Sequence, residues 1–475
     1  MGTSLPFYRP LTPEDVRQID DTARQILEDV GIHICDGAFL DELKTAGAMI
    51  DYDTERVRFS ADWLGEVLSR APSRFTLHSR NSQKDLFLGE GKVYFTNGGR
   101  VFRLYDTEAD DYRLTLLRDV AQTARLVDYL KHLDFYIIAC QAHDLAPDNY
   151  HLNDFYHALN GTMKHVMGGC DNLEGVRQMW ELASFVAGGE DKLRERPFVS
   201  IITNPISPLT IEPNTLNILA FCVKHGIPVT CAPAPIAGAT SPATLAGTLA
   251  QMHAEALAGV AIAQVLAPGA KVLYGAVPAI IDLRNMEFAI GSVEMGMMNA
   301  AAVQLAKLYH LPVYASGGVT EAKRPDIQAG CEKTLTILLS GMAAADCVHL
   351  AAGMLDSGNA ISYEQFVIDN EVIGMSKRVL SGIRVNEATL GLNTIKKVGP
   401  GGNYITEEHT VEHMLDEFFY PNPSVRLNFD IWQDAGQPDM LSSARVQVQQ
   451  ILQDGKGDLL ARDLIHNAFP GIQDV

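Results

Sequence analysis

Between residues 93 and 351, short apolar runs alternate with longer amphipathic stretches, which is the pattern of repeated strand–helix units. The apolar runs predict eight strands: Val93–Thr96, Phe135–Cys140, His165–Met167, Val199–Thr203, Pro228–Ala232, Val272–Gly275, Pro312–Ala315 and Cys347–Ala351. The amphipathic stretches predict helices, clearest at Leu173–Val186, Asn214–Lys224, Leu245–Leu266, Val293–Tyr309 and Gln328–Ala345. Eight near-regular units favour a closed α/β fold, a (β/α)8 TIM barrel, over the alternative of a doubly wound open sheet.

The chain before this region is dominated by helical periodicity. Thr12-Pro13-Glu14-Asp15 has the order of a helix start, with Thr as N-cap, Pro in the first turn and acidic residues behind it. Further helices are expected over residues 36–46 and 60–70, with short strands near Val57–Phe59 and Phe75–Ser79. We therefore expect a mostly helical N-terminal segment over residues 1–90 and the barrel over residues 91–382.

Two departures from the regular repeat are predicted. The first unit carries an inserted hairpin, Arg100–Asp106 with Asp111–Leu114, before the helix Leu116–Leu130. After the eighth strand a long helix, Tyr363–Ser381, leads into residues 383–475, which include a helix at Glu408–Phe419 and an extended stretch at Asn422–Phe429. We expect this C-terminal helical and arm extension to pack on the barrel or on a neighbouring subunit, and hence a homo-oligomer.

Composition and charge exclude several classes of protein. Apolar residues make up 47% of the chain, and the formal net charge of −20 disfavours nucleic acid, which needs a basic face. The seven cysteines are odd in number and scattered, as in a reduced, cytoplasmic protein. The first residues lack the pattern of a signal peptide, and no uninterrupted apolar run reaches the ~18 residues of a membrane helix, so no membrane association is expected.

In a barrel of this kind, reactive groups come from the carboxyl ends of the strands. The residues at the predicted strand ends are Tyr94, Asn97, Gly98-Gly99, Gln141, His143, Gly168-Gly169, Asn204, Tyr274, Gly317-Gly318, Glu321 and His349. Many are small, which indicates either a wide mouth for a ligand or glycines that only serve tight turns.

The polar and aromatic candidates each have a structural interpretation beside the functional one. His349 stands inside an apolar strand and is either a satisfied core residue or a mouth residue. Tyr94 and Tyr274 either fill the barrel or wall an aromatic cage for a cation. Glu321 follows a Gly-Gly turn that allows it to face the solvent or the mouth.

Metal and nucleophile chemistry find little support in the sequence. His33 and Cys35 could begin a zinc site, but no nearby Cys-x-x-Cys or His pair completes it. His409 and His413 have helical spacing without the Glu of a His-Glu-x-x-His motif. Neither a Gly-x-Ser-x-Gly elbow nor a P-loop is visible. We therefore expect no metal of the protein's own.

Three stretches together resemble the trimethylamine methyltransferase family, and the similarity extends over most of the chain. They are the run Pro235–Gly247 (PIAGATSPATLAG), then Tyr274-Gly275, then GGVTEAK at 317–323 with DIQAG at 326–330. The resemblance implies a TIM barrel that moves a methyl group from an amine to the Co(I) centre of a corrinoid (cobalamin) carried by a separate protein.

One departure from the family pattern bears on the substrate. Archaeal trimethylamine enzymes of this family carry pyrrolysine in the barrel mouth, at a position that the resemblance places in or near Ser316–Glu321. Every residue here is one of the standard twenty. The chain thus resembles a non-pyrrolysine member acting on a quaternary amine, with glycine betaine as the leading candidate and proline betaine, carnitine and γ-butyrobetaine as rivals.

From this resemblance and the strand-end positions we assign expected roles. Tyr94, Tyr274 and Tyr314 would contact the trimethylammonium group through cation–π interactions of roughly 0.5–2 kcal/mol each. Asn204 and His349 would donate hydrogen bonds to the substrate carboxylate, and Glu321 would complement the cation. Glu321 and His349 are the expected catalytic residues, while Asn97, Gly317 and Gly318 complete the expected substrate-binding set.

Two rival functions stay open at this point. One is a uroporphyrinogen-decarboxylase-like transferase that moves a methyl group from a corrinoid to a thiol, which would need a zinc–thiolate site. The other is a barrel that binds betaine without catalysis.

Overall fold

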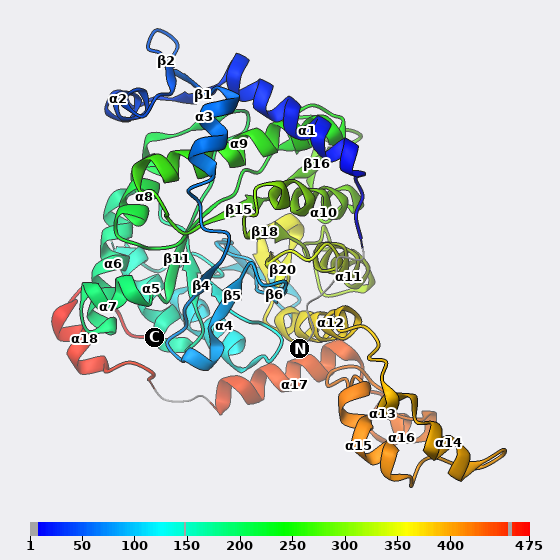
Figure 1. Ribbon diagram of the computed structural model, residues 1–475. Helices are drawn as coiled ribbons and strands as arrows, with labels where there is room; N and C mark the ends of the chain where they lie inside the picture. The colour runs from blue at the N-terminus through cyan, green and yellow to red at the C-terminus, as the bar shows by residue number, and fades with distance from the viewer. Residues whose placement is uncertain (1–7, 147–148, 455–457) are drawn as a thin grey trace.

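The central sheet of the protein confirms the barrel (Figure 1). The computed structural model describes residues 8–146, 149–454 and 458–475. In these residues eight parallel strands follow the order β6-β19-β18-β15-β13-β11-β10-β9. Their bounds are β6 Tyr94–Phe95, β9 Tyr136–Ile137, β10 Val166–Gly168, β11 Val199–Thr203, β13 Val229–Cys231, β15 Val272–Ala276, β18 Val313–Ser316 and β19 Cys347–His349. The sheet closes where Thr96 pairs in parallel with Phe135.

A ring of helices surrounds the sheet, one after each strand (Figure 1). They are α4 Leu117–Tyr129, α5 Tyr150–Gly161, α6 Leu173–Ala187, α8 Pro213–Lys224, α9 Leu245–Leu266, α10 Val293–Leu308, α11 Ile327–Met342 and α12 Tyr363–Leu380, with the short α7 Glu190–Glu195 after α6. Each ring helix contacts the next, and α12 contacts α4. The ring therefore closes as the sheet does, which is the arrangement that covers both faces of a parallel sheet.

Helix α9 is apolar on all sides because it is covered on all sides. Length and composition alone would let it cross a membrane, yet 94% of its apolar window is buried inside the fold. Its N-cap is Thr244, whose side chain accepts a hydrogen bond from the Gly247 amide. A helix buried on every face is expected where a barrel helix is itself covered by an outer layer. Here α1 (Pro13–Gln25) and α3 (Ala61–Leu68) both contact α9 and supply that layer.

The N-terminal segment contains the predicted helices, together with more short strands than the sequence predicts. Besides α1 and α3 it contains η1 Ile26–Val30, β1 Ile32–Ile34, α2 Gly37–Thr45, β2 Met49–Asp51, β3 Arg56–Arg58, β4 Phe75–Leu77, η2 Ser82–Lys84 and β5 Leu86–Leu88. The strands predicted near Val57–Phe59 and Phe75–Ser79 are confirmed as β3 and β4, whereas β1, β2 and β5 were not predicted. Strand β1 also pairs with β12 (Thr210–Ile211), which follows barrel strand β11, so this sheet joins the segment to the barrel.

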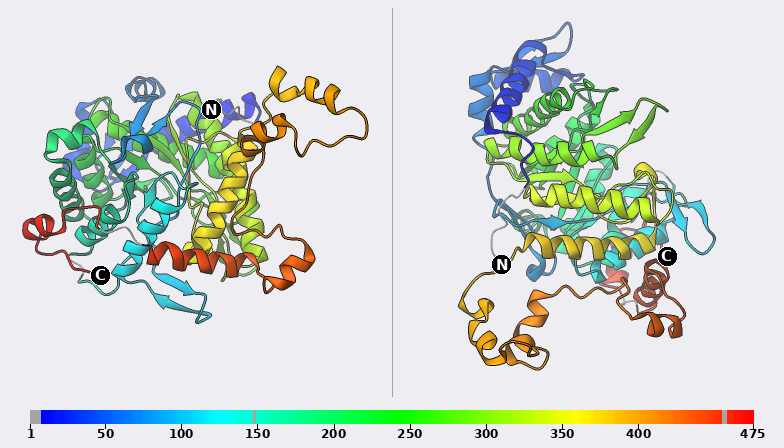
Figure 2. Two further views of the ribbon diagram at one scale, coloured as in Figure 1. Left: turned by 90° about the horizontal axis from the view of Figure 1, so that it is seen from below. Right: turned by 90° about the vertical axis from the view of Figure 1, so that its right-hand side faces the viewer.

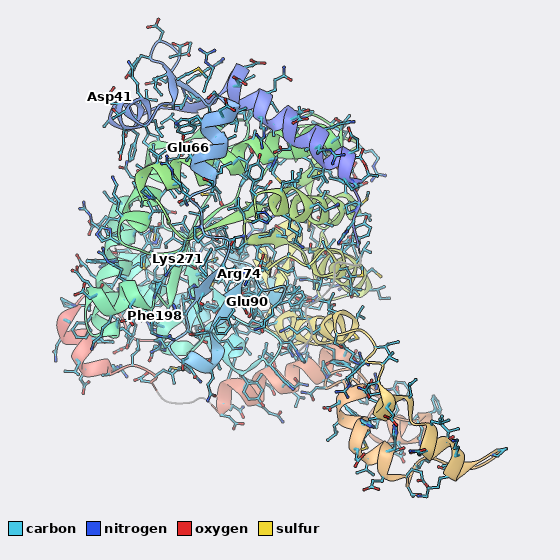
Figure 3. The ribbon with its side chains drawn as sticks, in the orientation of Figure 1. Asp41, Glu66, Arg74, Glu90, Phe198 and Lys271 are labelled. Carbon is cyan, nitrogen blue, oxygen red and sulfur yellow. The ribbon has the colours of Figure 1, made fainter. Side chains whose placement is uncertain are left out.

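The hairpin β4–β5 covers the amino-terminal end of the barrel. Leu77, Leu86 and Leu88 of this hairpin share one apolar cluster with barrel residues such as Leu273 and Cys347. Figure 3 shows Phe198 and Lys271, which immediately precede β11 and β15, in the same central region of the molecule as Arg74 and Glu90 at the ends of the hairpin. This end of the barrel is thus closed by the chain itself, which leaves the opposite end for a ligand.

Two small sheets stand at the carboxyl-terminal end. One is β14 Ile236–Ala237, β16 Ala279–Asp282 and β17 Glu287–Ala289. The other is β20 Met354–Leu355, β21 Ala360–Ile361, β7 Arg103–Asp106 and β8 Asp111–Leu114, with η4 Asp356–Gly358 between β20 and β21. The predicted hairpin after β6 is therefore confirmed as β7–β8. These sheets form walls around the mouth of the barrel.

The C-terminal region divides into a projecting part and a packed part. Helices α13 Glu387–Leu390, α14 Leu392–Val398, α15 Glu408–Glu417 and α16 Phe429–Asp434 extend away from the barrel (Figures 1 and 2). None of these four helices contains a buried residue. By contrast α17 (Met440–Gln453) packs on α12 and α4, and α18 (Arg462–Ala468) buries Ile465.

Candidate active site at the barrel mouth

A cavity of about 470 Å³ lies at the carboxyl ends of the barrel strands. Its lining combines residues that follow the strands, such as Gly169, Ala232 and Val277, with Phe288 from the wall strand β17. The lining is mostly apolar and mixes small residues with isoleucine, leucine and aromatic side chains. The cavity supports the first of the two interpretations, a wide mouth, because Gly99 and Gly169 line it.

Tyr314 and His349 form the aromatic floor of this cavity. Their rings stack at 4.0 Å between centroids with 21° between planes. Burial lowers the pKa of His349 to about 3, so the imidazole is neutral at physiological pH. Its Nε2 lies 2.7 Å from the Oγ of Ser316, which donates to the Ala276 carbonyl, so the imidazole Nε2–H donates to Ser316. A neutral ring held this way positions the tyrosine beneath the cavity.

The Tyr314 hydroxyl is buried and has no hydrogen-bond partner among the described residues. Burial raises its pKa well above the usual value, so it remains a neutral donor. An unpaired buried hydroxyl costs roughly 1–3 kcal/mol, which a bound polar group could offset. Together with its position in the cavity lining, this makes Tyr314 a candidate for contact with a ligand.

Arg100 and Asp171 are the charged residues among the described lining of the cavity. The guanidinium Nη1 lies 2.6 Å from Asp171 Oδ1 and Nη2 lies 3.2 Å from Oδ2, a two-pronged contact. Arg100 also lies over the Tyr150 ring at 5.5 Å. The cavity is therefore neutral overall but carries one positive and one negative group side by side.

Asn204 is exposed, directly follows β11 and lines the cavity, as expected. The loop that carries it is fixed by the buried carboxylate of Glu255, on α9. Glu255 accepts hydrogen bonds from the Ser207 hydroxyl at 2.7 Å and the Leu209 amide at 2.9 Å. Burial raises the pKa of Glu255, and the hydrogen bonds from the loop oppose that shift. Glu255 is thus a supporting residue that the sequence pattern did not reveal.

The thiol in the cavity is not a nucleophile. Cys170 follows β10 and lines the cavity, and burial raises its pKa to about 12. A thiol with so high a pKa stays protonated at neutral pH. Among the described residues, the group of side chains with metal-ligand geometry is His33, Cys35 and Glu55, which does not line this cavity. The structure thus offers no zinc–thiolate at the described strand ends.

The prediction that Tyr274 faces the mouth is wrong. Tyr274 is fully buried, and its hydroxyl lies 2.8 Å from Nδ1 of His253 on the surrounding helix α9. Its neighbour Leu273 belongs to the cluster inside the barrel instead. Because side chains alternate along a strand, Tyr274 must point outward when Leu273 points inward.

Tyr94 lies at the wrong end of the barrel for its expected role. It belongs to the interior cluster, but its hydroxyl accepts a hydrogen bond from the Phe87 amide of the covering hairpin at 3.0 Å. Tyr94 is the first residue of β6, so it stands at the amino-terminal end of the strand. It fills the closed end of the barrel and does not line the cavity.

Asn97 closes the sheet and does not face a ligand. Its Oδ1 accepts from the Ile137 amide at 3.0 Å, and its Nδ2 donates to the Ile137 carbonyl at 2.7 Å. The Asn97 side chain thus makes the two hydrogen bonds that a neighbouring strand's backbone would make with Ile137, where β6 meets β9. The expected substrate-binding role does not fit this position.

Glu321, Gly317 and Gly318 shape the loop after β18 without lining the cavity. Glu321 Oε1 accepts from the Gly291 amide at 2.6 Å, and burial raises the pKa of this carboxyl. A Cβ on Gly317 would stand 2.8 Å from the Thr336 carbonyl oxygen. Gly318, with φ of +93°, would place one 2.7 Å from Ala351 Cα. These glycines permit close packing, so their role is structural.

Of the residues expected in the site, Asn204, Tyr314 and His349 line the cavity. Arg100, Asp171 and Phe288 line it as well, although they were not expected. Arg100 stands directly after Gly98-Gly99 at the end of β6, so its strand-end position was a signal in the sequence. Phe288 gives no such signal, because it comes from a wall strand outside the repeat.

The chain was compared with known proteins. Residues 1–467 match the family model described as "Trimethylamine methyltransferase (MTTB)". A trimethylamine methyltransferase MttB of Desulfitobacterium hafniense is 35% identical over 93% of this chain and 88% of its own length. A glycine betaine methyltransferase of Desulfitobacterium hafniense is 32% identical over 95% of this chain and 94% of its own length. The MttB of Methanosarcina thermophila is 31% identical over 98% of this chain and 96% of its own length.

Solved structures support the fold. The monomethylamine methyltransferase MtmB of Methanosarcina barkeri superposes with a TM-score of 0.51 at 12% sequence identity, covering 92% of this chain and 94% of its own. Identity this low bears on the fold alone.

Proposed function

The chain belongs to the trimethylamine methyltransferase family, and from that premise we propose that it transfers a methyl group from glycine betaine to a corrinoid carried by a separate protein. The family and the named activities of the relatives support an enzyme that takes a methyl group from a methylated amine. The corrinoid would supply the nucleophile, Co(I), and accept the methyl group.

The observation that carries the choice of substrate is a neutral cavity with one ion pair on its wall. Glycine betaine bears a cation and a carboxylate a few bonds apart. Asp171 and the Tyr314 ring suit the trimethylammonium group, while Arg100, Asn204 and the Tyr314 hydroxyl suit the carboxylate. A simple amine would leave Arg100 without a ligand partner.

The residues of this chain orient the substrate and exclude water, and they need not exchange a proton with it. Loss of a methyl cation equivalent from a quaternary amine leaves a neutral tertiary amine, so the leaving group requires no acid. This agrees with His349 being held neutral and Cys170 being held protonated in the cavity. Catalysis would then depend on aligning the methyl group with the acceptor, a matter of position.

Methyl transfer to free cob(I)alamin tests the proposal. The purified protein is mixed with cob(I)alamin under anoxic, reducing conditions, glycine betaine is added, and formation of methylcobalamin is followed by absorbance. Proline betaine, carnitine and γ-butyrobetaine are run in parallel, so that conversion with one of them alone keeps the reaction and changes the substrate. Binding of glycine betaine without conversion, even with a corrinoid protein present, would favour the non-catalytic barrel.

The ion pair has its own test. Arg100→Gln should weaken binding of glycine betaine about tenfold or more. Tetramethylammonium lacks a carboxylate and should bind as well as before or more tightly, because Asp171 loses its competing cation. Arg284→Gln is the matched control, because Arg284 forms an exposed pair with Asp282 and does not line the cavity. Calorimetry with both ligands on both variants would refute the assignment of Arg100 if the two ligands responded equally.

We propose that the projecting helices α13–α16 bind a second copy of the chain. Apolar residues in this region are exposed: Leu415 of α15 at 71% of its surface, and Ile383 and Ile405 in the segments beside the helices at 85% and 77%. Four helices without a buried residue have no core of their own to stabilise them. A partner surface would supply the missing burial, which supports a homo-oligomer.

A further inference from the structure

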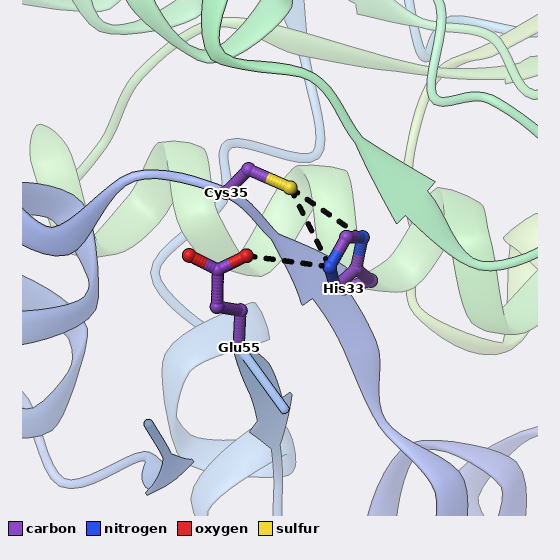
Figure 4. A group of neighbouring side chains, drawn as sticks. All are labelled: His33, Cys35 and Glu55. Atoms are coloured by element: carbon purple, nitrogen blue, oxygen red, sulfur yellow. Dashed lines mark hydrogen bonds and ion pairs between the residues drawn. The ribbon is translucent and has the colours of Figure 1, made fainter. Parts of the chain in front are cut away.

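His33, Cys35 and Glu55 come together on the N-terminal sheet, outside the cavity (Figure 4). One potential ligand atom from each lies within 4.8 Å of the others. His33 Nε2 is 3.4 Å from Cys35 Sγ and 3.6 Å from Glu55 Oε2. Ligand atoms around a tetrahedral zinc stand roughly 3.3–3.6 Å apart, given its bond lengths of about 2.0–2.3 Å. The three side chains are therefore close to the spacing that one metal ion requires.

The backbone explains why these residues meet. His33 lies in β1 and Cys35 directly follows this strand. They flank the buried Ile34, so both side chains project to the side opposite Ile34. The Ile34 amide donates to the Glu55 carbonyl at 2.9 Å, which sets Glu55 beside them. Glu55 itself has a left-handed φ of +52° at the end of the β2–β3 turn. The side chains are thus presented by paired strands and need no rearrangement of the chain to meet.

The charge around the group also suits a cation. The Glu55 carboxylate stands at the group itself, with its Oε2 3.6 Å from His33 Nε2. Arg56 pairs with His33 across the strands but is exposed to solvent, where its charge is screened. A thiol, an imidazole and a carboxylate form a mixed sulfur, nitrogen and oxygen set, which is the borderline chemistry that Zn²⁺ prefers.

We propose that His33, Cys35 and Glu55 bind Zn²⁺, with water completing the coordination. The Cys35 thiol gives up its proton to solvent as its sulfur bonds to the metal, so one proton is released for each zinc bound. The ion would link β1 to the turn before β3. Its role is to stabilise the N-terminal sheet, whose strand β1 pairs with β12 of the barrel region, since the group does not line the cavity.

Thiol accessibility and Co²⁺ spectroscopy together test this site on the full-length protein. Cys35 and Cys331 are the exposed free cysteines among the described residues, so each serves as control for the other. Without metal, a thiol reagent should modify two thiols quickly. With excess Zn²⁺ the reagent should modify only one thiol quickly, that of Cys331. In the Cys331→Ser variant with Zn²⁺, no thiol should react quickly. Co²⁺ should give the strong visible and near-ultraviolet bands of a tetrahedral thiolate site.

Variants of the three proposed ligands, with Cys331→Ser as control, test whether these side chains bind the metal. Cys35→Ser should abolish the thiolate band and weaken Co²⁺ binding at least tenfold, whereas Cys331→Ser should leave both unchanged. His33→Asn and Glu55→Gln, checked for native circular dichroism, should each weaken binding with the thiol still present. Zinc that fails to slow modification of Cys35, or Co²⁺ bands that survive Cys35→Ser, would overturn the proposal.

Discussion

The buried ion pair Lys333–Asp369 offers a stringent test of how the mouth is supported. Both side chains are fully buried, and Lys333 Nζ lies 2.9 Å from Asp369 Oδ2. Lys333 also donates to the Gly318 carbonyl at 2.6 Å, and Asp369 accepts from the Gly353 amide at 2.8 Å. The pair thus connects α11 and α12 to the loops after β18 and β19. Replacing Lys333 with Met keeps the volume but leaves a buried carboxylate without its cation.

The expected loss follows from this geometry. At 2.9 Å the attraction is worth ~6 kcal/mol for an effective dielectric constant near 20, but most of it offsets the cost of burying two charges. Breaking such a pair on one side typically costs about 3–5 kcal/mol. Lys333→Met should therefore lower the free energy of unfolding by that amount, measured by urea denaturation at pH 7.

The stability lost in Lys333→Met should also depend on pH. Burial raises the pKa of Asp369 even in the wild type, and removal of Lys333 should raise it further. A carboxyl whose folded pKa exceeds its unfolded pKa favours folding at low pH and loses that contribution as pH rises through the folded value. The loss in Lys333→Met should thus be larger at pH 8 than at pH 5.5.

The double variant Lys333→Met/Asp369→Leu supplies the control. It removes the stranded charge and should recover most of the lost stability, because apolar residues of similar volume can replace a buried pair. A single variant that loses less than about 1 kcal/mol, or a double variant less stable than the single one, would refute this account.

Further predictions concern single side chains and the projecting helices. Burial lowers the pKa of His349 to about 3, so the free energy of unfolding of the wild type should fall as the pH falls below about 6.5. Between pH 7 and pH 5, urea titrations of His349→Gln should show a fall about 2 kcal/mol smaller than that of the wild type. Tyr274→Phe should cost about 0.5–1.5 kcal/mol of stability with KM for the amine unchanged, whereas Tyr314→Phe should raise KM severalfold; equal KM values would remove Tyr314 from the site. Val411→Glu with Leu415→Glu should lower the oligomeric mass in analytical ultracentrifugation without unfolding the protein, since both side chains are more than 60% exposed.

The barrel could be predicted from the sequence because short apolar runs are typical of buried parallel strands. All eight predicted strands overlap an observed one. The three-residue strands β1, β2 and β5 were not predicted. Strands β10, β13 and β19 are equally short, but each belongs to a repeated strand–helix unit, which the isolated strands lack. The barrel can be predicted because its strand–helix unit is repeated many times along the chain. An isolated short strand has no such repeat to indicate it.

The candidate site was less accessible, because a strand's period fixes two faces but not which one is inside. Leu273 and Tyr274 are both compatible with an apolar interior, and the structure assigns the interior to Leu273. Asn97 failed for another reason: its amide pairs with Ile137 across the barrel seam, and no one-dimensional pattern reports that closure. Tyr314 and His349 were found because they combine the correct face with a position near the mouth.

The parallel pairing of β1 with β12 also has a consequence for how the chain is made. His33 pairs with Thr210, so the ribosome must add the whole stretch from residue 34 to residue 210 before β1 can meet its partner. At ~5–20 residues per second this takes roughly 9–35 s. During that interval one edge of β1 is open to pairing with other nascent chains, a hazard that a three-residue strand with a polar histidine at its centre keeps small. The order of synthesis thus gives a reason for the shortness of this strand.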